Sequence, residues 1–453
     1  MKKLIALLLA VVMVMGLAAC GSKTTTETKA PTEAKVDTPA TEAKTDAPAA
    51  AGSVYYLNFK PEFDQALQGL AASYTEKTGV PVKVVTAASG DYSNTLNAQM
   101  GKDGAPTVYN IGNMSGLKDW DEYALDLTGT ALAGELATND FNLYNEAGEL
   151  KAMGYCYESF GIIVNTKLLA DAGHSLDEIK DFASLKAVAD DIHARAAELG
   201  FDAFSSAGLD SSSSWRFSGH LANMPLYYEF RDDGVTEQPA EIKGTYLDNF
   251  RNIWDLYITD SAADSTALST ATGDQSEAEF GEGKAVFYQN GTWEYAALTA
   301  DKFNLNPDEI AMIPIYCGVD GEEKAGLCSG TENCWAINSQ AKEEDIQASL
   351  DFLYWLVTDP DASAVLVEQL GAVPFKSCPA SANKFIVDGN ALLADGKYAV
   401  TWAFNYTPNV DSWRATVVTA LAAYSADPTD ANWEAVKTAF VDGWAIEYKT
   451  VNG

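Results

Sequence analysis

Positive charge is scarce in this chain of 453 residues. It holds 30 Lys and Arg against 64 Asp and Glu, which gives a formal net charge of -34 at pH 7. Such a surface repels polyanions, so the composition argues against binding of nucleic acid. It does not identify a cationic ligand, because an acidic surface mainly confers solubility.

Metal-ligand patterns and common catalytic motifs are missing. The three His residues form no ligand pattern and the Cys spacings lack a CxxC pair, so we expect no metal site and no cofactor. There is no GxSxG, HExxH or glycine-rich phosphate loop, so we expect no catalytic residues and no enzyme. A secreted glycan-degrading enzyme stays an alternative, because its carboxylate pair would pass unnoticed among 64 acidic residues.

Long apolar runs are absent beyond the amino terminus. There, a charged start at residues 1–3 precedes the run Leu4 to Val14, as in a secretory signal. The run is too short to span a bilayer. It leads into Leu17-Ala18-Ala19-Cys20-Gly21, which resembles a bacterial lipobox. The resemblance implies a signal peptide over residues 1–20 that ends at a lipidated Cys20.

Residues 21–52 contain almost only small and polar types, with Val36 the single larger apolar residue. Such a segment buries too little surface to offset its ordering entropy, so a flexible tether is predicted. An anchor followed by a tether indicates an extracytoplasmic protein held at the cell membrane by lipid.

Cysteine is also sparse. Apart from Cys20, the chain has Cys156, Cys317, Cys328, Cys334 and Cys378. This odd number requires a free thiol or an intermolecular bond. Outside the cell a disulfide among Cys317, Cys328 and Cys334 is possible.

The remaining roughly 400 residues suit two lobes better than one core. Strands are predicted at 54–57, 82–86 and 107–111, alternating with helices at 62–78 and 92–100. Gly79 would cap the first helix. This order predicts the start of a parallel α/β sheet. A second α/β region begins with a strand at 161–165 and a short helix at 166–172, and further helices are expected at 182–199, 246–257 and 345–357.

Polar residues follow the first three predicted strands. Lys60 and Glu62 follow the first, Asp91 the second and Asn113 the third. Because ligands of open α/β sheets bind beyond the carboxyl ends of the strands, we expect these side chains to line one cleft. The alternative is that they belong to ordinary polar loops.

Five segments carry a family resemblance: 74–80 (YTEKTGV), 104–108 (GAPTV), 158–165 (ESFGIIVN), 289–293 (QNGTW) and 371–375 (GAVPF). Together they resemble the extracellular solute-binding proteins of carbohydrate ABC importers, the group that contains maltose-binding protein. Thr107 departs from the Asp that is usual in the second segment.

The resemblance implies an α/β, two-lobed, periplasmic-binding-protein-like fold of type II, with a hinge and three chain crossings. It divides the chain into lobe 1, residues 53–158 plus 314–373, and lobe 2, residues 159–313 plus 374–453. It also implies a monomer that captures a sugar or short oligosaccharide between the lobes, closes around it and delivers it to membrane permease subunits.

A sugar offers apolar faces and a rim of hydroxyls, so its site needs aromatic platforms and polar partners. The resemblance points to Trp293 and Trp413 as stacking residues and to Glu158 as a polar contact. Trp215 follows a Ser-rich run, which predicts a loop at the rim of the cleft. Aromatic residues with carboxylates also suit a polyamine, a peptide or a metal ion. A surface adhesin without a small ligand is a further alternative.

Overall fold

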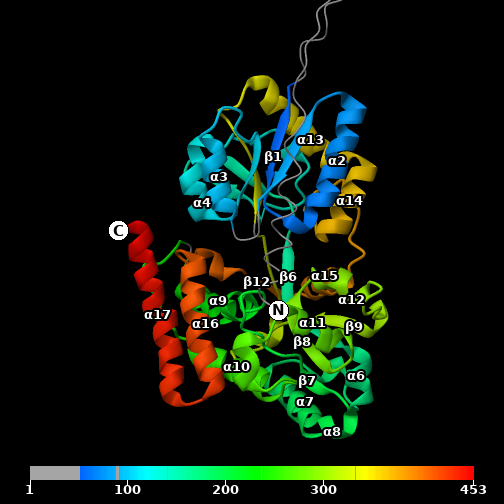
Figure 1. Cartoon of the computed structure of the whole chain (residues 1–453), viewed down its shortest axis with the longest axis vertical. Coiled ribbons are helices and arrows are strands. Elements are labelled where there is room, and N and C mark those ends of the chain that lie inside the picture. The colour runs from blue at the N-terminus through cyan, green and yellow to red at the C-terminus, as the bar shows by residue number, and fades with distance from the viewer. Residues whose placement is uncertain (1–51, 88–90, 140, 236, 332) are drawn as a thin grey trace, which may run out of the picture. The chain divides into compact units, whose positions relative to one another are not determined.

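The computed structural model describes residues 52–453 except 88–90, 140, 236 and 332; of Glu62 and Ser115 it describes only the backbone (Figure 1). The predicted signal peptide, Cys20 and residues 21–51 of the predicted tether lie outside the described residues. The described chain is an α/β structure with two sheets, which confirms the predicted fold class.

The first sheet has the strand order β2-β1-β3-β11-β5-β4. Its strands are β1 (Val54–Asn58), β2 (Val82–Thr86), β3 (Val108–Ile111), β4 (Leu143–Tyr144), β5 (Leu150–Gly154) and β11 (Cys334–Ile337). Strand β1 pairs in parallel with β2 and β3, while β11 runs antiparallel to β3 and β5. The three predicted strands are confirmed, and their carboxyl ends lie at one edge of the sheet.

Helices cover both faces of this sheet. They are α2 (Asp64–Thr78), α3 (Tyr92–Met100), α4 (Met114–Trp120), α5 (Ala131–Gly134), α13 (Glu343–Thr358) and α14 (Pro360–Leu370). Helix α2 ends at Gly79, whose φ of 78° is left-handed and whose N–H donates to the Thr75 carbonyl, so the predicted cap is confirmed. Tyr56 and Leu57 belong to different core clusters because side chains alternate along a strand.

The second sheet has the order β12-β10-β6-β8-β7, with β9 also paired to β6. Its strands are β6 (Glu158–Asn165), β7 (Asp202–Phe204), β8 (Ala285–Gly291), β9 (Ile310–Ile313), β10 (Ala325–Gly330) and β12 (Tyr398–Thr401). Strand β6 pairs with β8 along one edge and with β10 and then β9 along the other. The predicted strand at 161–165 is the second half of β6, buried throughout.

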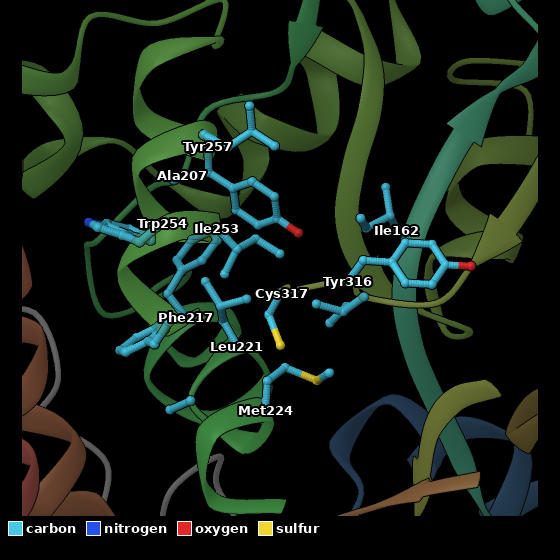
Figure 2. Packing of buried hydrophobic residues seen from close by; sticks show 14 of the residues in the cluster. Ile162, Ala207, Phe217, Leu221, Met224, Ile253, Trp254, Tyr257, Tyr316 and Cys317 are labelled. Atoms are coloured by element: carbon cyan, nitrogen blue, oxygen red, sulfur yellow. The ribbon is translucent and has the colours of Figure 1, made fainter. Parts of the chain in front are cut away.

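The second sheet carries the remaining described α-helices. They are α6 (Thr166–Asp171), α7 (Phe182–Ala194), α8 (Ala196–Leu199), α9 (Asn223–Asp233), α10 (Leu247–Thr259), α11 (Gly273–Gly281), α12 (Glu294–Thr299), α15 (Lys384–Ala394), α16 (Val410–Ala426) and α17 (Asp430–Asn452). Figure 2 shows part of their core, where Phe217 packs edge-on against Trp254, with ring centroids 5.0 Å apart. The long helices α16 and α17 lie side by side (Figure 1).

The chain passes between the two sheets at three places. The first passage lies between β5 and β6, at residues 155–157. The predicted change from lobe 2 to lobe 1 at 313/314 comes too early in the chain. Strand β10 lies after this point but still pairs with β6 and β12 of the second sheet. The second passage therefore follows Gly330. The third follows Cys378, since Phe375 bridges to Leu136 and the Cys378 thiol donates to the Val357 carbonyl of α13. Hydrophobicity could not separate these strands, because β10 and β11 are both buried.

Candidate functional site

A cavity of about 690 Å³ is lined by residues that come from both sheets and from the passages between them. This size is within the range of small-molecule sites. Its lining contains the segments 112–114, 137–138, 141–143, 329–331, 373–374 and 405–406, together with Tyr157, Ser159, Ile386, Gly389, Asn390, Leu393, Ala399, Thr401 and Trp402.

The loop after β3 places Asn113 at the cavity. Asn113 is the N-cap of α4, and its side chain accepts a hydrogen bond of 2.9 Å from the Gly116 N–H. This cap fixes the orientation of the Asn113 side chain. Because Asn113 follows β3, it lies at the carboxyl edge of the first sheet, as predicted. It is the one predicted ligand-binding residue that lines this cavity.

The first passage contributes the opposite wall. Tyr157 and Ser159 both line the cavity, and the Ser159 hydroxyl lies 2.7 Å from that of Ser329 in β10. Tyr157 stacks on Phe141, with ring centroids 5.0 Å apart and planes within 11°. Burial raises the pKa of Tyr157 above its ordinary value, so its hydroxyl stays protonated and can donate or accept a hydrogen bond.

Trp402 supplies a second aromatic surface. Its indole N–H donates to the Cys328 carbonyl over 3.2 Å. The ring lies over Gly330, where an added Cβ would come within 2.5 Å of the Trp402 ring carbon Cδ2. Only glycine permits this close approach of the indole to the backbone. The cavity thus has aromatic groups from the loop before β4 (Phe141), from the first passage (Tyr157) and from the segment after β12 (Trp402 and Tyr406).

The polar groups of the described lining residues are all uncharged. They are the amides Asn113, Asn142, Asn390 and Asn405, the hydroxyls Thr138, Ser159, Ser329, Thr331 and Thr401, and the phenols Tyr157 and Tyr406. Among the residues described around the cavity none is Asp, Glu, Lys, Arg or His, although charged residues make up 21% of the chain. Amides and hydroxyls can both donate and accept hydrogen bonds, as the hydroxyls of a neutral ligand require.

Two predicted site residues form an ion pair. Lys60 Nζ lies 2.6 Å from Glu158 Oε1, and the side chains are 3% and 14% exposed. Lys60 follows β1 of the first sheet, while Glu158 begins β6 of the second. The pair does not line the cavity, although Glu158 stands between Tyr157 and Ser159 in the sequence. The ion pair therefore links the loop after β1 to the start of β6, at the end of the first passage.

Trp215 and Trp293 come together elsewhere on the second sheet. Their ring centroids are 5.8 Å apart, and both lie near the His220 ring. His220 belongs to a π-helical turn, Arg216–Leu221, and stacks on Phe160 with centroids 3.9 Å apart. Burial, then Arg414 and Arg216, hold the pKa of His220 well below its ordinary value.

Gly291, two residues before Trp293, leaves room for the indole ring. A Cβ at Gly291 would lie within 2.1 Å of the Trp293 ring. Neither Trp215 nor Trp293 lines the cavity, so they form a separate aromatic surface.

One prediction is corrected, that for Trp413, while Asp91 stays a prediction. Trp413 is fully buried; its indole N–H donates to the Phe440 carbonyl, and the ring packs against Phe440 and Trp444. It is therefore a core residue of the α16–α17 pair. Asp91 is exposed as the N-cap residue of α3, where its carboxylate accepts from the Asn94 amide over 2.8 Å, and it does not line the cavity. The side chain of Glu62 lies outside the description.

The sequence prediction missed most of the cavity. Tyr157 and Ser159 flank Glu158, so the prediction identified the crossing segment but not the two side chains in it that line the cavity. The alternation of side chains along β6 explains this, because neighbours point to opposite faces. Trp402, Asn405 and Tyr406 form a short aromatic and amide-rich segment, the one signal that could have suggested them.

The described cysteines form no disulfide. The free thiols are Cys156, Cys317, Cys328, Cys334 and Cys378, so the possible disulfide among Cys317, Cys328 and Cys334 is not formed. Within the described residues no group of three or more His, Cys, Asp or Glu could hold a metal ion. No helix in the described part of the chain has both the length and the hydrophobicity to cross a membrane.

Two sheets, three passages of the chain and a cavity lined from both sides define a two-lobed ligand-binding fold. The sequence model of one family, described as bacterial extracellular solute-binding protein, matches residues 69–394. The match spans most of the chain, and the chain therefore belongs to the bacterial extracellular solute-binding proteins. A search of curated proteins found no match.

Solved structures show the same fold. RafE in complex with raffinose superposes with a TM-score of 0.68 at 15% identity, over 88% of this chain and 99% of RafE. The GacH receptor of Streptomyces glaucescens, solved without ligand and with acarbose, gives 0.62 at 19% identity, over 88% and 99%. A sugar transporter protein of Bacillus licheniformis in complex with stachyose gives 0.63 at 14% identity, over 87% and 100%.

Proposed function

We propose that this protein captures a sugar or short oligosaccharide in the cavity and delivers it to the membrane permease of an ABC importer. The observation that carries the proposal is the lining itself, which combines the Tyr157 and Trp402 rings with uncharged amides and hydroxyls. Aromatic rings suit the apolar faces of a sugar, and the neutral polar groups suit its hydroxyls. Raffinose, acarbose and stachyose in the related structures support this ligand class.

The same lining disfavours the alternative ligands. A polyamine or a metal ion needs carboxylates, and a peptide or amino acid needs partners for its charged termini. None of the residues described around the cavity provides such a charge. Glu158, which stands between the lining residues Tyr157 and Ser159, is already paired with Lys60 at 2.6 Å. The described lining residues also include no carboxylate pair of the kind that a glycoside hydrolase uses, and we propose a receptor without catalytic activity.

Closure would complete the site. Gly112–Met114 follow β3 of the first sheet, and Thr401–Tyr406 follow β12 of the second, so the ligand would touch both parts of the chain. A ligand that contacts both parts stabilises the conformation in which they are closest. The permease would then recognise this closed form. We propose a monomer, exported and anchored through Cys20, in which residues 21–52 act as the tether.

The test is a thermal-shift screen of the purified protein, followed by calorimetric titration of each hit. The ligands are mono- and oligosaccharides, amino acids, short peptides, polyamines and divalent cations. Because a ligand that binds only the folded state raises Tm by mass action, a shift with saccharides alone supports the proposal. A shift with cations or peptides alone would contradict the ligand class, and release of reducing ends from a bound glycan would contradict a receptor.

Two variants locate the ligand. Asn405→Ala removes a cavity amide and should weaken saccharide binding by about 1–3 kcal/mol, because the sugar hydroxyl that it served is left unpaired. Asn252→Ala removes an exposed amide in the middle of α10, away from the cavity lining, and should leave the affinity unchanged.

A further inference from the structure

We infer that the ligand is a glycoside with an apolar substituent: a saccharide that carries an alkyl or aryl group directly on the ring that the cavity holds. The inference rests on the proposed function and narrows its substrate class. Its basis is that two unlike surfaces lie next to each other in the cavity, one made of hydroxyl groups and the other of apolar side chains.

The first surface is a row of hydroxyl groups across three neighbouring strands. Ser159 in β6 is paired with Ser329 in β10, and Ser329 is paired with Thr401 in β12. Residues paired in this way present their side chains on the same face of a sheet. The Ser159 and Ser329 hydroxyl oxygens are 2.7 Å apart, and all three residues line the cavity. This hydroxyl row, with Trp402 next in the chain, can bind the hydroxyls and one face of a sugar ring.

The second surface lies where the first passage meets the segment that follows α14. The Tyr157 N–H donates to the Ala372 carbonyl over 3.0 Å. The Ala137 N–H donates to the Pro374 carbonyl over 2.9 Å. The Tyr157 ring also stacks on Phe141, with centroids 5.0 Å apart. Backbone bonds and ring stacking therefore hold these three parts of the chain together.

Helix α15 packs against the same place. A Cβ added at Gly371 would lie 2.8 Å from Ile386 Cδ1, so the helix touches the segment that follows α14. The residues that these contacts bring together, and that line the cavity, are named the apolar wall: Ala137, Phe141, Tyr157, Val373, Pro374 and Ile386.

The hydroxyl row and the apolar wall are adjacent. Ser159 of the row follows Tyr157 of the wall by two residues, which is about 7 Å along an extended chain, and side chains two residues apart point to the same side. A group attached directly to a ring at the hydroxyl row would therefore reach the wall. The lining also includes Met114 and Leu393, whose side chains are 44% and 45% exposed. An apolar group on the ligand would remove such surface from water, which favours binding.

The experiment is calorimetric titration with methyl, propyl and pentyl glycosides in both anomeric forms. The sugars are glucose, galactose, maltose, lactose and any other saccharide that raises Tm. For at least one anomer, each added CH2 group should strengthen binding by about 2–4-fold, so the pentyl glycoside should bind at least about 15-fold more tightly than the methyl glycoside. Pentanol, which lacks the sugar, should show no detectable binding.

Three variants assign this gain to the apolar wall. Val373→Thr keeps the shape of the side chain but adds a hydroxyl, and should lower the pentyl-to-methyl affinity ratio by at least about threefold. Its control, Val387→Thr, makes the same change at a side chain of α15 that is 50% exposed and outside the described lining, so the ratio should stay the same. Ser329→Ala shortens the hydroxyl row and should weaken the whole series by about fivefold without changing the ratio. Circular dichroism melts establish that each variant is folded.

The outcomes separate the inference from the proposed function. If no saccharide or glycoside binds, the proposed function fails and the inference fails with it. If saccharides bind, but every pentyl glycoside binds within about threefold of its methyl glycoside, sugar capture stands and the apolar substituent is refuted. The second result is also expected if a further sugar ring occupies the apolar wall. An equal fall of the ratio in Val373→Thr and Val387→Thr would overturn the assignment to the wall.

Discussion

The ion pair between Lys60 and Glu158 should contribute more to the free energy of unfolding than an exposed ion pair on the surface. The two atoms are 2.6 Å apart, and the side chains are only 3% and 14% exposed, so water screens their attraction weakly. Replacing one partner leaves a largely buried charge without the other. We expect Lys60→Met or Glu158→Gln alone to lower the free energy of unfolding by about 2–4 kcal/mol.

The double variant should be much less destabilised than the sum of the single ones. Urea denaturation of the four proteins of this cycle gives the coupling energy, which we expect to be about 1.5–3 kcal/mol. The matched control is Lys243 with Asp233, 2.7 Å apart but 68% and 34% exposed, for which coupling of at most about 0.5 kcal/mol is expected. Equal coupling in the two pairs would refute the reasoning that burial strengthens the inner pair.

Three further predictions concern stability and binding. Burial and then Glu277 raise the pKa of Glu294 to about 7; the folded protein therefore holds a proton that the unfolded chain loses, and stability falls as pH rises from about 4.5 to 7. Glu294→Gln should remove this loss of stability, which amounts to at most about 3 kcal/mol and to less if the carboxylate stays hydrated. The measurement is the change in urea midpoint between pH 5 and pH 8, and an identical change in the wild-type protein and in the variant would contradict the prediction. Gly330→Ala places a methyl group against the Trp402 indole and should lower the free energy of unfolding by about 1–3 kcal/mol. Gly69→Ala has open space around it on α2 and should raise the free energy of unfolding by about 0.5–1 kcal/mol. Thermal melts of the two variants compare these effects. Trp413→Ala should cost about 3–5 kcal/mol of stability, because it empties a fully buried site. Trp293→Ala, outside the cavity lining, should keep the fold and leave the affinity for the saccharide unchanged, and a loss of about 1–3 kcal/mol in calorimetric titration would place Trp293 in the site.

The first sheet was largely predictable from the sequence because its information is local. The alternation of apolar runs and helical spacing located β1, α2, β2, α3 and β3, and Gly79 fixed the end of α2. The boundary near residue 314 was not predictable, since both sheets use short buried strands and only pairing decides to which sheet β10 belongs.

The cavity was harder to predict because it assembles segments that are far apart in sequence. Asn113 was found through the rule for strand ends, whereas Trp402 and Asn405 follow an edge strand of the other sheet. Trp413 shows a second difficulty: a Trp in a helix has the same local signal whether it faces a ligand or another helix. Its burial against Phe440 and Trp444 depends on how α16 and α17 pack.

The most direct test of the account is a crystal structure of the protein with the saccharide that gives the largest thermal shift. The account predicts the sugar in the 690 Å³ cavity, with a ring face against Tyr157 or Trp402 and hydroxyls bonded to Asn113, Asn390 or Asn405. A saccharide bound outside this cavity, with these side chains untouched, would contradict the assignment of the site.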